Sequence, residues 1–199
     1  MRTRKLLLAL LFAPPLLLLS QTPANNSPRA EPPLPVIDTN ACPFEGCTFR
    51  KWPAIKDAAI FSSWKKDRKQ ITIVRKGQIV TGLTGVHITL EPDRAKVLKP
   101  IPDLGVKPGD IILRYMYEGE GYANIWTNGK WHKDYDCSFL KEKDGSGCTR
   151  DCSAVVVSDG RKEWWVQVKT QQEATGWTKV EDQFECMDSV GGDEKCDKL

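Results

Sequence analysis

The sequence predicts an all-β protein made of short strands that form one or two small barrels. Three observations predict this class: from Ala58 onward apolar and polar residues alternate in short runs, these runs are rich in β-branched residues, and glycines separate them. A period of two between turn residues is typical of β-strands. Roughly 140 core-forming residues are enough for two small barrels or for one elaborated barrel.

Seven runs are expected to be strands: QITIV (70–74), QIVTGLTGVHITL (78–90), DIILRYMY (110–117), YANIW (122–126), SAVVVS (153–158), WWVQVK (164–169) and GWTKV (176–180). A shorter strand is expected at 59–61, where PAIKDAAIFSSW is only a weak helical candidate. The proline-containing stretch 90–110 is expected to be a long loop between strands, because prolines interrupt pairing.

The N-terminus predicts export. MRTRK carries three positive charges and precedes the apolar run LLLALLFAPPLLLL, which is short and interrupted by Pro14 and Pro15. This pattern is typical of a secretory signal peptide, expected here as residues 1–24, with cleavage after Ala30 or a retained N-terminal anchor as alternatives. No membrane span is expected after cleavage. Residues 25–41 are rich in proline and polar residues and are expected to be a linker.

Cysteine usage agrees with a periplasmic or extracellular location. The chain has seven cysteines, at positions Cys42, Cys47, Cys137, Cys148, Cys152, Cys186 and Cys196. An oxidising compartment favours three disulfides and one free or intermolecular thiol. Spacing does not fix the pairing, but Cys42–Cys47 and Cys186–Cys196 are sterically possible local bridges.

A zinc site is the alternative for part of this set. His132, Cys137, Cys148 and Cys152 are ligands of the type that zinc prefers. The spacing of Cys148 and Cys152 is not the usual one, and export favours oxidation of these thiols, so we expect disulfides and no metal or other cofactor.

The charges are balanced but unevenly distributed. Removing Arg2, Arg4 and Lys5 from the 29 basic residues leaves as many basic as acidic side chains, 26 of each. Residues 51–114 contain 13 basic and 6 acidic side chains, whereas residues 115–199 contain 11 basic and 17 acidic ones. A neutral chain argues against nucleic-acid binding. The polarity favours contact between the two halves, contact with a charged partner, or two solvated surfaces.

The side chains do not assemble a catalytic constellation, and we expect no enzyme activity. The chain contains two histidines, His87 and His132, and no cysteine lies in a recognisable nucleophile motif. His87 lies in the alternating run TGVHITL and is expected to be a surface or half-buried strand residue rather than a catalytic base.

The tryptophans are the remaining functional signal. In WTNGKW, Asn128-Gly129 predicts a two-residue hairpin turn, which places Trp126 opposite Trp131 on one face. Such a pair stabilises a hairpin or forms a ligand platform. In WWVQVK, alternation places Trp164 with the two valines, and Trp165 with Gln167, on opposite faces. Because the valines must be buried, Trp165 is expected to point away from their core and to be partly exposed, unless a second unit covers it.

Several stretches resemble bacterial SH3-like (SH3b) domains. WWVQVKTQQEATGW resembles their last hairpin through Trp165, Val168 and Gly176-Trp177, and AAIFSSWKKDRKQITIVRKGQIVTGLTG resembles their opening strands. With CPFEGCTFRKW and YEGEGYANIWTNGKW, the chain is similar to exported SH3-like proteins of unassigned activity. The resemblance implies a first unit at 42–135, a cysteine-containing connector at 136–152, a second and shorter unit at 153–185, and a cysteine-containing polar tail at 186–199. One barrel with an added sheet, or two interlocked half-barrels, fits the same pattern.

The resemblance also implies a function. In SH3-type domains, the tryptophan at the position of Trp165 lines a peptide-binding groove. Our further candidate ligand-binding residues in this sequence are Gln167, Trp126, Trp131 and Tyr122. We therefore expect a non-catalytic binding module whose partner is a peptidoglycan stem peptide or an envelope protein. The alternative is a secreted interaction or inhibitor protein that docks through its charge polarity and whose tryptophans are structural.

Overall fold

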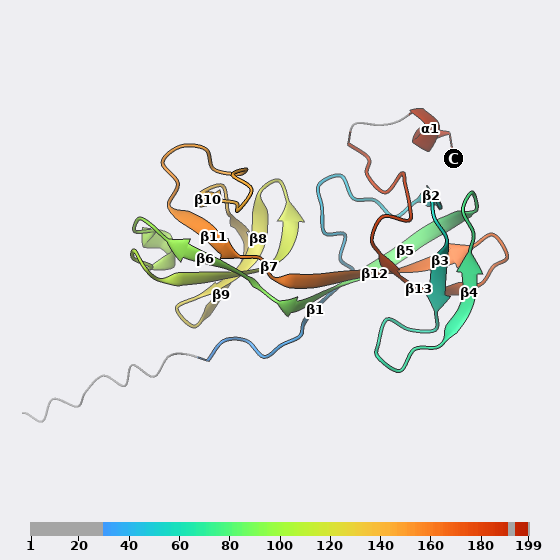
Figure 1. The fold of residues 1–199 in the computed structure, drawn as a ribbon, viewed down its shortest axis with the longest axis horizontal. Coiled ribbons are helices and arrows are strands. Elements are labelled where there is room, and N and C mark those ends of the chain that lie inside the picture. Colours follow the sequence, from blue (N-terminus) through green and yellow to red (C-terminus); the bar gives the residue numbers. More distant parts are fainter. Residues whose placement is uncertain (1–29, 191–193, 199) are drawn as a thin grey trace, which may run out of the picture.

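The computed structural model describes residues 30–190 and 194–198, in which nearly all regular structure is β (Figure 1). The all-β prediction is confirmed, and curled sheets form a half-barrel. The predicted signal peptide and the first residues of the predicted linker lie outside the described residues. Within the described ranges, no helix is long and apolar enough to cross a membrane.

The first sheet has seven strands in the order β1-β5-β12-β13-β3-β4, and β2 also pairs with β5. Its strands are β1 (Val36–Thr39), β2 (Lys51–Pro53), β3 (Ala58–Phe61), β4 (Gln70–Val74), β5 (Ile79–Glu91), β12 (Arg161–Thr170) and β13 (Thr175–Val180). All pairs within this sheet are antiparallel.

The second sheet has six strands in the order β10-β11-β6-β7-β8-β9. Its strands are β6 (Asp93–Val97), β7 (Ile111–Gly119), β8 (Tyr122–Thr127), β9 (Lys130–Asp136), β10 (Leu140–Lys141) and β11 (Ala154–Ser158). The short 3-10 helix η1 (Pro102–Leu104) precedes β7, and the one-turn helix α1 (Glu194–Asp197) lies near the C-terminus. Figure 1 shows the two sheets side by side along the long axis of the molecule.

The chain passes between the sheets twice, at adjacent places. Pro92 alone separates β5 from β6, and the return from β11 to β12 passes through Gly160. A Cβ at Gly160 would lie 2.1 Å from the carbonyl oxygen of Glu91, so only glycine allows the two crossings to approach so closely. The predicted segments 42–135 and 153–185 therefore both contribute strands to both sheets.

The predicted strands are all found, with ends shifted by a few residues at most, and the strand predicted at 59–61 is β3. Two stretches differ from expectation. The expected long loop 90–110 contains β6, in which Asp93, Ala95 and Val97 are buried and Arg94 and Lys96 are less so. This alternation is that of a strand, and the neighbouring prolines masked it. Residues 36–39 of the predicted linker form β1, which pairs with β5.

Three apolar clusters stabilise the fold. The first lies on one face of the first sheet and includes Trp52, Ile60, Val166 and Val168, with Trp164 packed against it. The second lies on the opposite face around Val86, Ile88 and Trp165. The third lies within the second sheet around Ile112, Ile125 and Val156. The first sheet is therefore packed on both faces.

Three disulfides link Cys42 to Cys47, Cys148 to Cys152 and Cys186 to Cys196, and Cys137 is a free, buried thiol. Three bridges and one free thiol were predicted, and the two local bridges suggested by spacing are confirmed. Burial raises the pKa of the Cys137 thiol to about 12, so this cysteine is unreactive at neutral pH.

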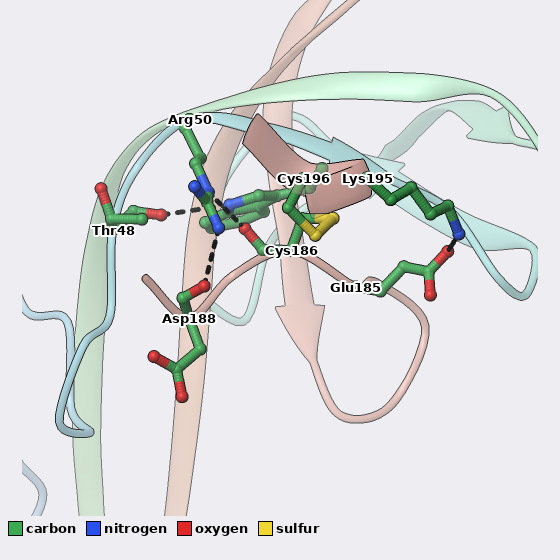
Figure 2. The surroundings of a disulfide bond; sticks show 8 residues. Thr48, Arg50, Glu185, Cys186, Asp188, Lys195 and Cys196 are labelled. Atoms are coloured by element: carbon green, nitrogen blue, oxygen red, sulfur yellow. Dashed lines mark hydrogen bonds and ion pairs between the residues drawn. A yellow bond between two sulfur atoms is a disulfide. The ribbon is translucent and has the colours of Figure 1, made fainter. Parts of the chain in front are cut away.

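The C-terminal segment is held against the N-terminal part of the first sheet. Figure 2 shows Arg50 beside the Cys186–Cys196 disulfide. Its Nε donates to the carbonyl of Cys186 at 2.8 Å, and its Nη2 donates to the carbonyl of Asp188 at 2.7 Å. Ser189 N donates to the carbonyl of Gly46 at 2.7 Å, so the tail also reaches the Cys42–Cys47 loop.

Candidate functional site

Trp165 was predicted to be partly exposed, and this prediction is wrong. The alternation is as expected, because Trp164, Val166 and Val168 share one core while Trp165 lies on the other face. That other face is also covered, and Trp165 is only 2% exposed. Phe61 packs edge-on against its indole, and the guanidinium of Arg68 lies 4.4 Å from its ring centroid. Trp165 Nε1 donates to Glu163 Oε2 at 2.9 Å, so the indole is also satisfied.

Gln167 shares the face of Trp165 and is half-buried. It lies in register between Thr84 of β5 and Trp177 of β13. The segment between β3 and β4 contributes Trp64 and Arg68 to the cover of this face.

The predicted hairpin is confirmed. Asn128 and Gly129 both have positive φ, at 50° and 70°, and Trp126 lies opposite Trp131 in the register of β8 and β9. The two ring centroids are 5.5 Å apart in an edge-on arrangement, and Tyr115 adds a third ring 4.6 Å from Trp131. Both tryptophans are half-buried.

Tyr122 lies elsewhere. It is 38% exposed and borders a groove of about 530 Å³ whose other lining residues belong to the Cys42–Cys47 loop, to the end of β7 with the turn that follows it, and to β9 through Asp134. The five candidate ligand-binding residues therefore lie at three separate places, and the structure does not bring them together.

The four candidate zinc ligands do not form a metal site. Cys148 and Cys152 form a disulfide, and His132 packs against Tyr135. Among the residues that the structure describes, no group of three or more His, Cys, Asp or Glu side chains is placed to hold a metal ion.

A different site lies where the two sheets meet. It is a pocket of about 460 Å³, which we call the junction pocket. Its lining residues are His87, Lys162, Glu163, Trp164 and Val180 from the first sheet, Asp93, Arg114, Tyr115 and Tyr117 from the second sheet, and Pro43 and Glu142 from loops or strand ends. Neither sheet alone contains this site, so it exists only because the chain crosses between them.

A partly buried ionic cluster around Asp93 lines the junction pocket. Asp93 Oδ2 accepts from Lys162 Nζ at 2.6 Å and from Arg114 Nε at 2.8 Å, and Asp93 Oδ1 accepts from the backbone N–H of Gly160 at 2.8 Å. Arg114 also forms a bidentate pair with Glu142, at 2.5 and 2.9 Å. The cluster joins strands of both sheets at the crossing.

The electrostatics of this cluster follow from burial and pairing. Burial by itself would raise the pKa of Asp93, but the charge and hydrogen bond of Lys162, the Gly160 N–H and Arg114 together hold this pKa below its usual value. Asp93 is therefore the fixed negative charge at the centre of the cluster. Arg114 uses three donor contacts on two carboxylates, whereas Lys162 donates to Asp93 alone among the described residues.

His87 also lines the pocket and is only 4% exposed, which corrects the expected surface or half-buried position. Its Nδ1 faces Asp38 Oδ2 across the β1–β5 pair at 3.9 Å. Both atoms are enclosed and neither has a hydrogen-bond partner. Thr89 Oγ1, two residues along the same strand, is also enclosed and unpartnered.

Trp164 also lines the junction pocket. It is directly opposite His87 in the register of β5 and β12. Its Nε1 donates to the carbonyl of Ala41 at 3.0 Å, and Phe44 packs edge-on against its ring. The indole fits because residue 85 is glycine: a Cβ there would lie 2.6 Å from Trp164 Nε1 and 2.2 Å from the carbonyl of Ala41.

No motif in the sequence pointed directly to this site. Asp38 fell in the predicted linker, Asp93 in the predicted loop, and Lys162 is one of many surface-type lysines in the sequence. The available signal was that His87 stands between Val86 and Ile88 in TGVHITL. A nearly continuous apolar run is typical of a strand that is buried on both faces, which would bury His87 as well.

Comparisons with known proteins do not assign this site. No protein-family model matches the chain, and neither curated proteins nor solved structures gave a match.

Proposed function

We propose that this protein is an exported, non-catalytic binding module whose ligand occupies the junction pocket. The observation that carries the proposal is the pocket itself: it is formed by both sheets and is lined by Lys162, which donates to Asp93 alone among the described residues, by a nearly enclosed histidine and by aromatic side chains. A few placed polar groups beside aromatic side chains are typical of small-molecule and peptide sites. Three disulfides support export, because such bonds persist in oxidising compartments.

The proposed ligand class is a cell-envelope peptide, with peptidoglycan stem peptides as the first candidate. This choice rests on the SH3b-like stretches of the sequence, and the pocket supports it because peptides carry the donors and acceptors that His87 and Lys162 would satisfy. The binding position differs from the one that the resemblance implies, since Trp165 is enclosed and Trp164 lines the pocket.

The test is retention of the mature protein on purified cell-wall sacculi, measured beside retention of the variant Lys162→Met. We expect wild-type protein to bind and Lys162→Met to bind about tenfold more weakly, because a hydrogen bond from a charged donor is lost. Lys143→Met is the matched control, since Lys143 is an exposed lysine paired with Asp159 at 2.7 Å outside the pocket. Melting temperatures of both variants separate lost binding from lost folding. Equal retention of all three proteins would contradict the proposal.

A second candidate function is docking to an acidic protein partner. The segment between β3 and β4 exposes Lys65, Lys66 and Lys69, and β4 is an edge strand whose Ile71 and Ile73 are 48% and 37% exposed. Edge strands pair readily with added strands, although lysines at an edge also prevent such pairing. Failure to bind sacculi, together with a partner lost on Lys65→Glu and Lys66→Glu substitution, would favour this function.

A further inference from the structure

The His87–Asp38 pair indicates how the junction pocket presents a hydrogen-bond acceptor. Asp38 Oδ2 lies 3.9 Å from His87 Nδ1 and has no hydrogen-bond partner. When an imidazole carries a single proton, a carboxylate that faces one ring nitrogen favours the proton on that nitrogen. The other nitrogen, Nε2, then keeps its lone pair and acts as an acceptor.

Nε2 is the less enclosed of the two ring nitrogens of His87. His87 lines the pocket, and Nδ1 is its enclosed nitrogen. Nε2 is not among the enclosed unpartnered atoms, and no residue in the described ranges forms a hydrogen bond with it. Because Nε2 is accessible and no described residue donates to it, a donor from outside the chain can occupy this position.

The surroundings of His87 favour a positively charged donor. Asp38 Oδ2 lies 3.9 Å from its Nδ1. Glu118 also interacts with it: burial and the charge of Asp38 raise the pKa of Glu118, whereas a hydrogen bond from Asn124 and the charge of His87 lower it. The indole of Trp164 lies opposite His87 on the same face. Aromatic faces and carboxylates attract ammonium groups.

Lys162, which also lines the pocket, favours an acceptor. Lys162 Nζ has three N–H donors, and the described residues take up one of them, through Asp93. In the register of β5 and β12, Lys162 lies opposite Thr89, two positions from His87 on the same face. Diagonal neighbours in a sheet are about 7–8 Å apart, a span that an amino acid or a dipeptide can bridge.

We propose that the junction pocket binds the free amino end of a short peptide, with its ammonium group donating to His87 Nε2 and a carbonyl or carboxylate accepting from Lys162 Nζ. Asp38 is then a positioning residue that holds His87 in the acceptor tautomer. The inference rests on the proposed function, because it names the ligand chemistry of the same pocket.

The first experiment compares three probes of one skeleton: dialanine, N-acetyl-dialanine and dialanine amide. Titrations followed by amide NMR report both affinity and the residues that the probe contacts. We expect dialanine to shift the signals of residues around His87 and Lys162, N-acetyl-dialanine to bind at least about tenfold more weakly, and the amide to lose less. Acetylation removes the positive charge of the terminal ammonium group and all but one of its N–H donors. Dialanine amide keeps a C-terminal carbonyl that can accept from Lys162.

The second experiment uses two replacements of His87. Glutamine places a polar atom near the position of Nε2, whereas asparagine places one near the position of Nδ1. We therefore expect His87→Gln to keep the preference for a free amine within about threefold, and His87→Asn to lose it, at similar melting temperatures. A loss of preference in both variants, or in neither, would overturn the role of Nε2.

The outcomes separate this inference from the proposed function. Equal binding of the three probes, with NMR shifts at the pocket, would overturn the inference that the ligand has a free amino group. The pocket would remain a binding site. Absence of any shift at His87 and Lys162 would mean that water alone fills the pocket and would overturn the inference. Retention on sacculi that depends on Lys162 would still support the proposed function in that case.

Discussion

Trp165 of the first sheet and the Trp126–Trp131 pair of the second sheet differ in how they are covered. In the first sheet, Trp165 is enclosed, because the face opposite the valines packs against Phe61, Val86 and Ile88 and is covered by Arg68. In the second sheet, Trp126 and Trp131 pair across a hairpin and stay half-buried. In both sheets, the alternation of residues along a strand determines the face on which each side chain lies. Whether that face is covered depends on segments far away in the sequence, here the one between β3 and β4.

Truncating a tryptophan of each sheet should give the largest contrast. Trp165→Ala is expected to lower the free energy of unfolding by about 3–5 kcal/mol, because it leaves a cavity in an enclosed cluster. Trp126→Ala is expected to cost clearly less, since that side chain already contacts solvent. Urea unfolding of both variants measures the difference. Similar losses would mean that the second sheet buries its tryptophans as fully as the first.

The disulfides of the two regions differ in the length of the loop that they close. Cys186–Cys196 fastens the tail beside Arg50, whereas Cys148–Cys152 closes a short loop of the second sheet with a sequence separation of only 4. Loop-closure entropy gives a loss of about 3 kcal/mol for the double Cys→Ser variant at 186 and 196, and about 2 kcal/mol for the one at 148 and 152. Thermal melts of both variants test the order.

A thiol count provides the control for these variants. In denaturant without reductant, wild-type protein should react once with a thiol reagent, at Cys137, because the other six cysteines are bridged. More than one reactive thiol before reduction would contradict the disulfide pattern and the expected order of the two losses.

The local features of both sheets could be predicted from the sequence, because adjacent residues determine them. Asn128-Gly129 fixes the turn and hence the Trp126–Trp131 pair, and the spacing within Cys42–Cys47 and Cys186–Cys196 allows local bridges. Asp93 and Lys162 meet only because the chain crosses twice between the sheets at Pro92 and Gly160. A crossing depends on long-range pairing, which alternation does not encode, so the junction pocket was not predictable.

The ionic cluster at this crossing should make the contact between the sheets sensitive to acid. Asp93→Asn removes the charge that Lys162 and Arg114 face, and we expect a loss of about 1–3 kcal/mol at neutral pH. The pKa of Asp93 is lowered in the folded protein, so its contribution is full above the unfolded pKa of about 3.9 and is lost as the pH falls through the lower folded value.

Unfolding curves at neutral and at strongly acidic pH test this sign. The difference in stability between wild type and Asp93→Asn should shrink as the pH falls. Asp144→Asn is the matched control, because Asp144 also has a lowered pKa, owing to its hydrogen bonds with Ser146, but lies on the surface. A gap for Asp93→Asn that does not change with pH would show that the variant acts through packing rather than charge.

The smallest expected effect concerns the aromatic pair of the second sheet. A double-mutant cycle with Trp126→Leu and Trp131→Leu should give a coupling energy of about 0.2–1 kcal/mol, because the rings are directly opposite and their centroids are 5.5 Å apart. The same Trp131→Leu substitution combined with Trp165→Leu is the control, and these should add within about 0.5 kcal/mol, since the residues lie in different sheets. Coupling between Trp131→Leu and Trp165→Leu would mean that the two sheets are packed as one unit. The difference between their tryptophans would then not be explained by the segments that cover each one. Additivity of Trp126 and Trp131 would mean that each ring is held mainly by other neighbours, with Tyr115 as the first candidate for Trp131.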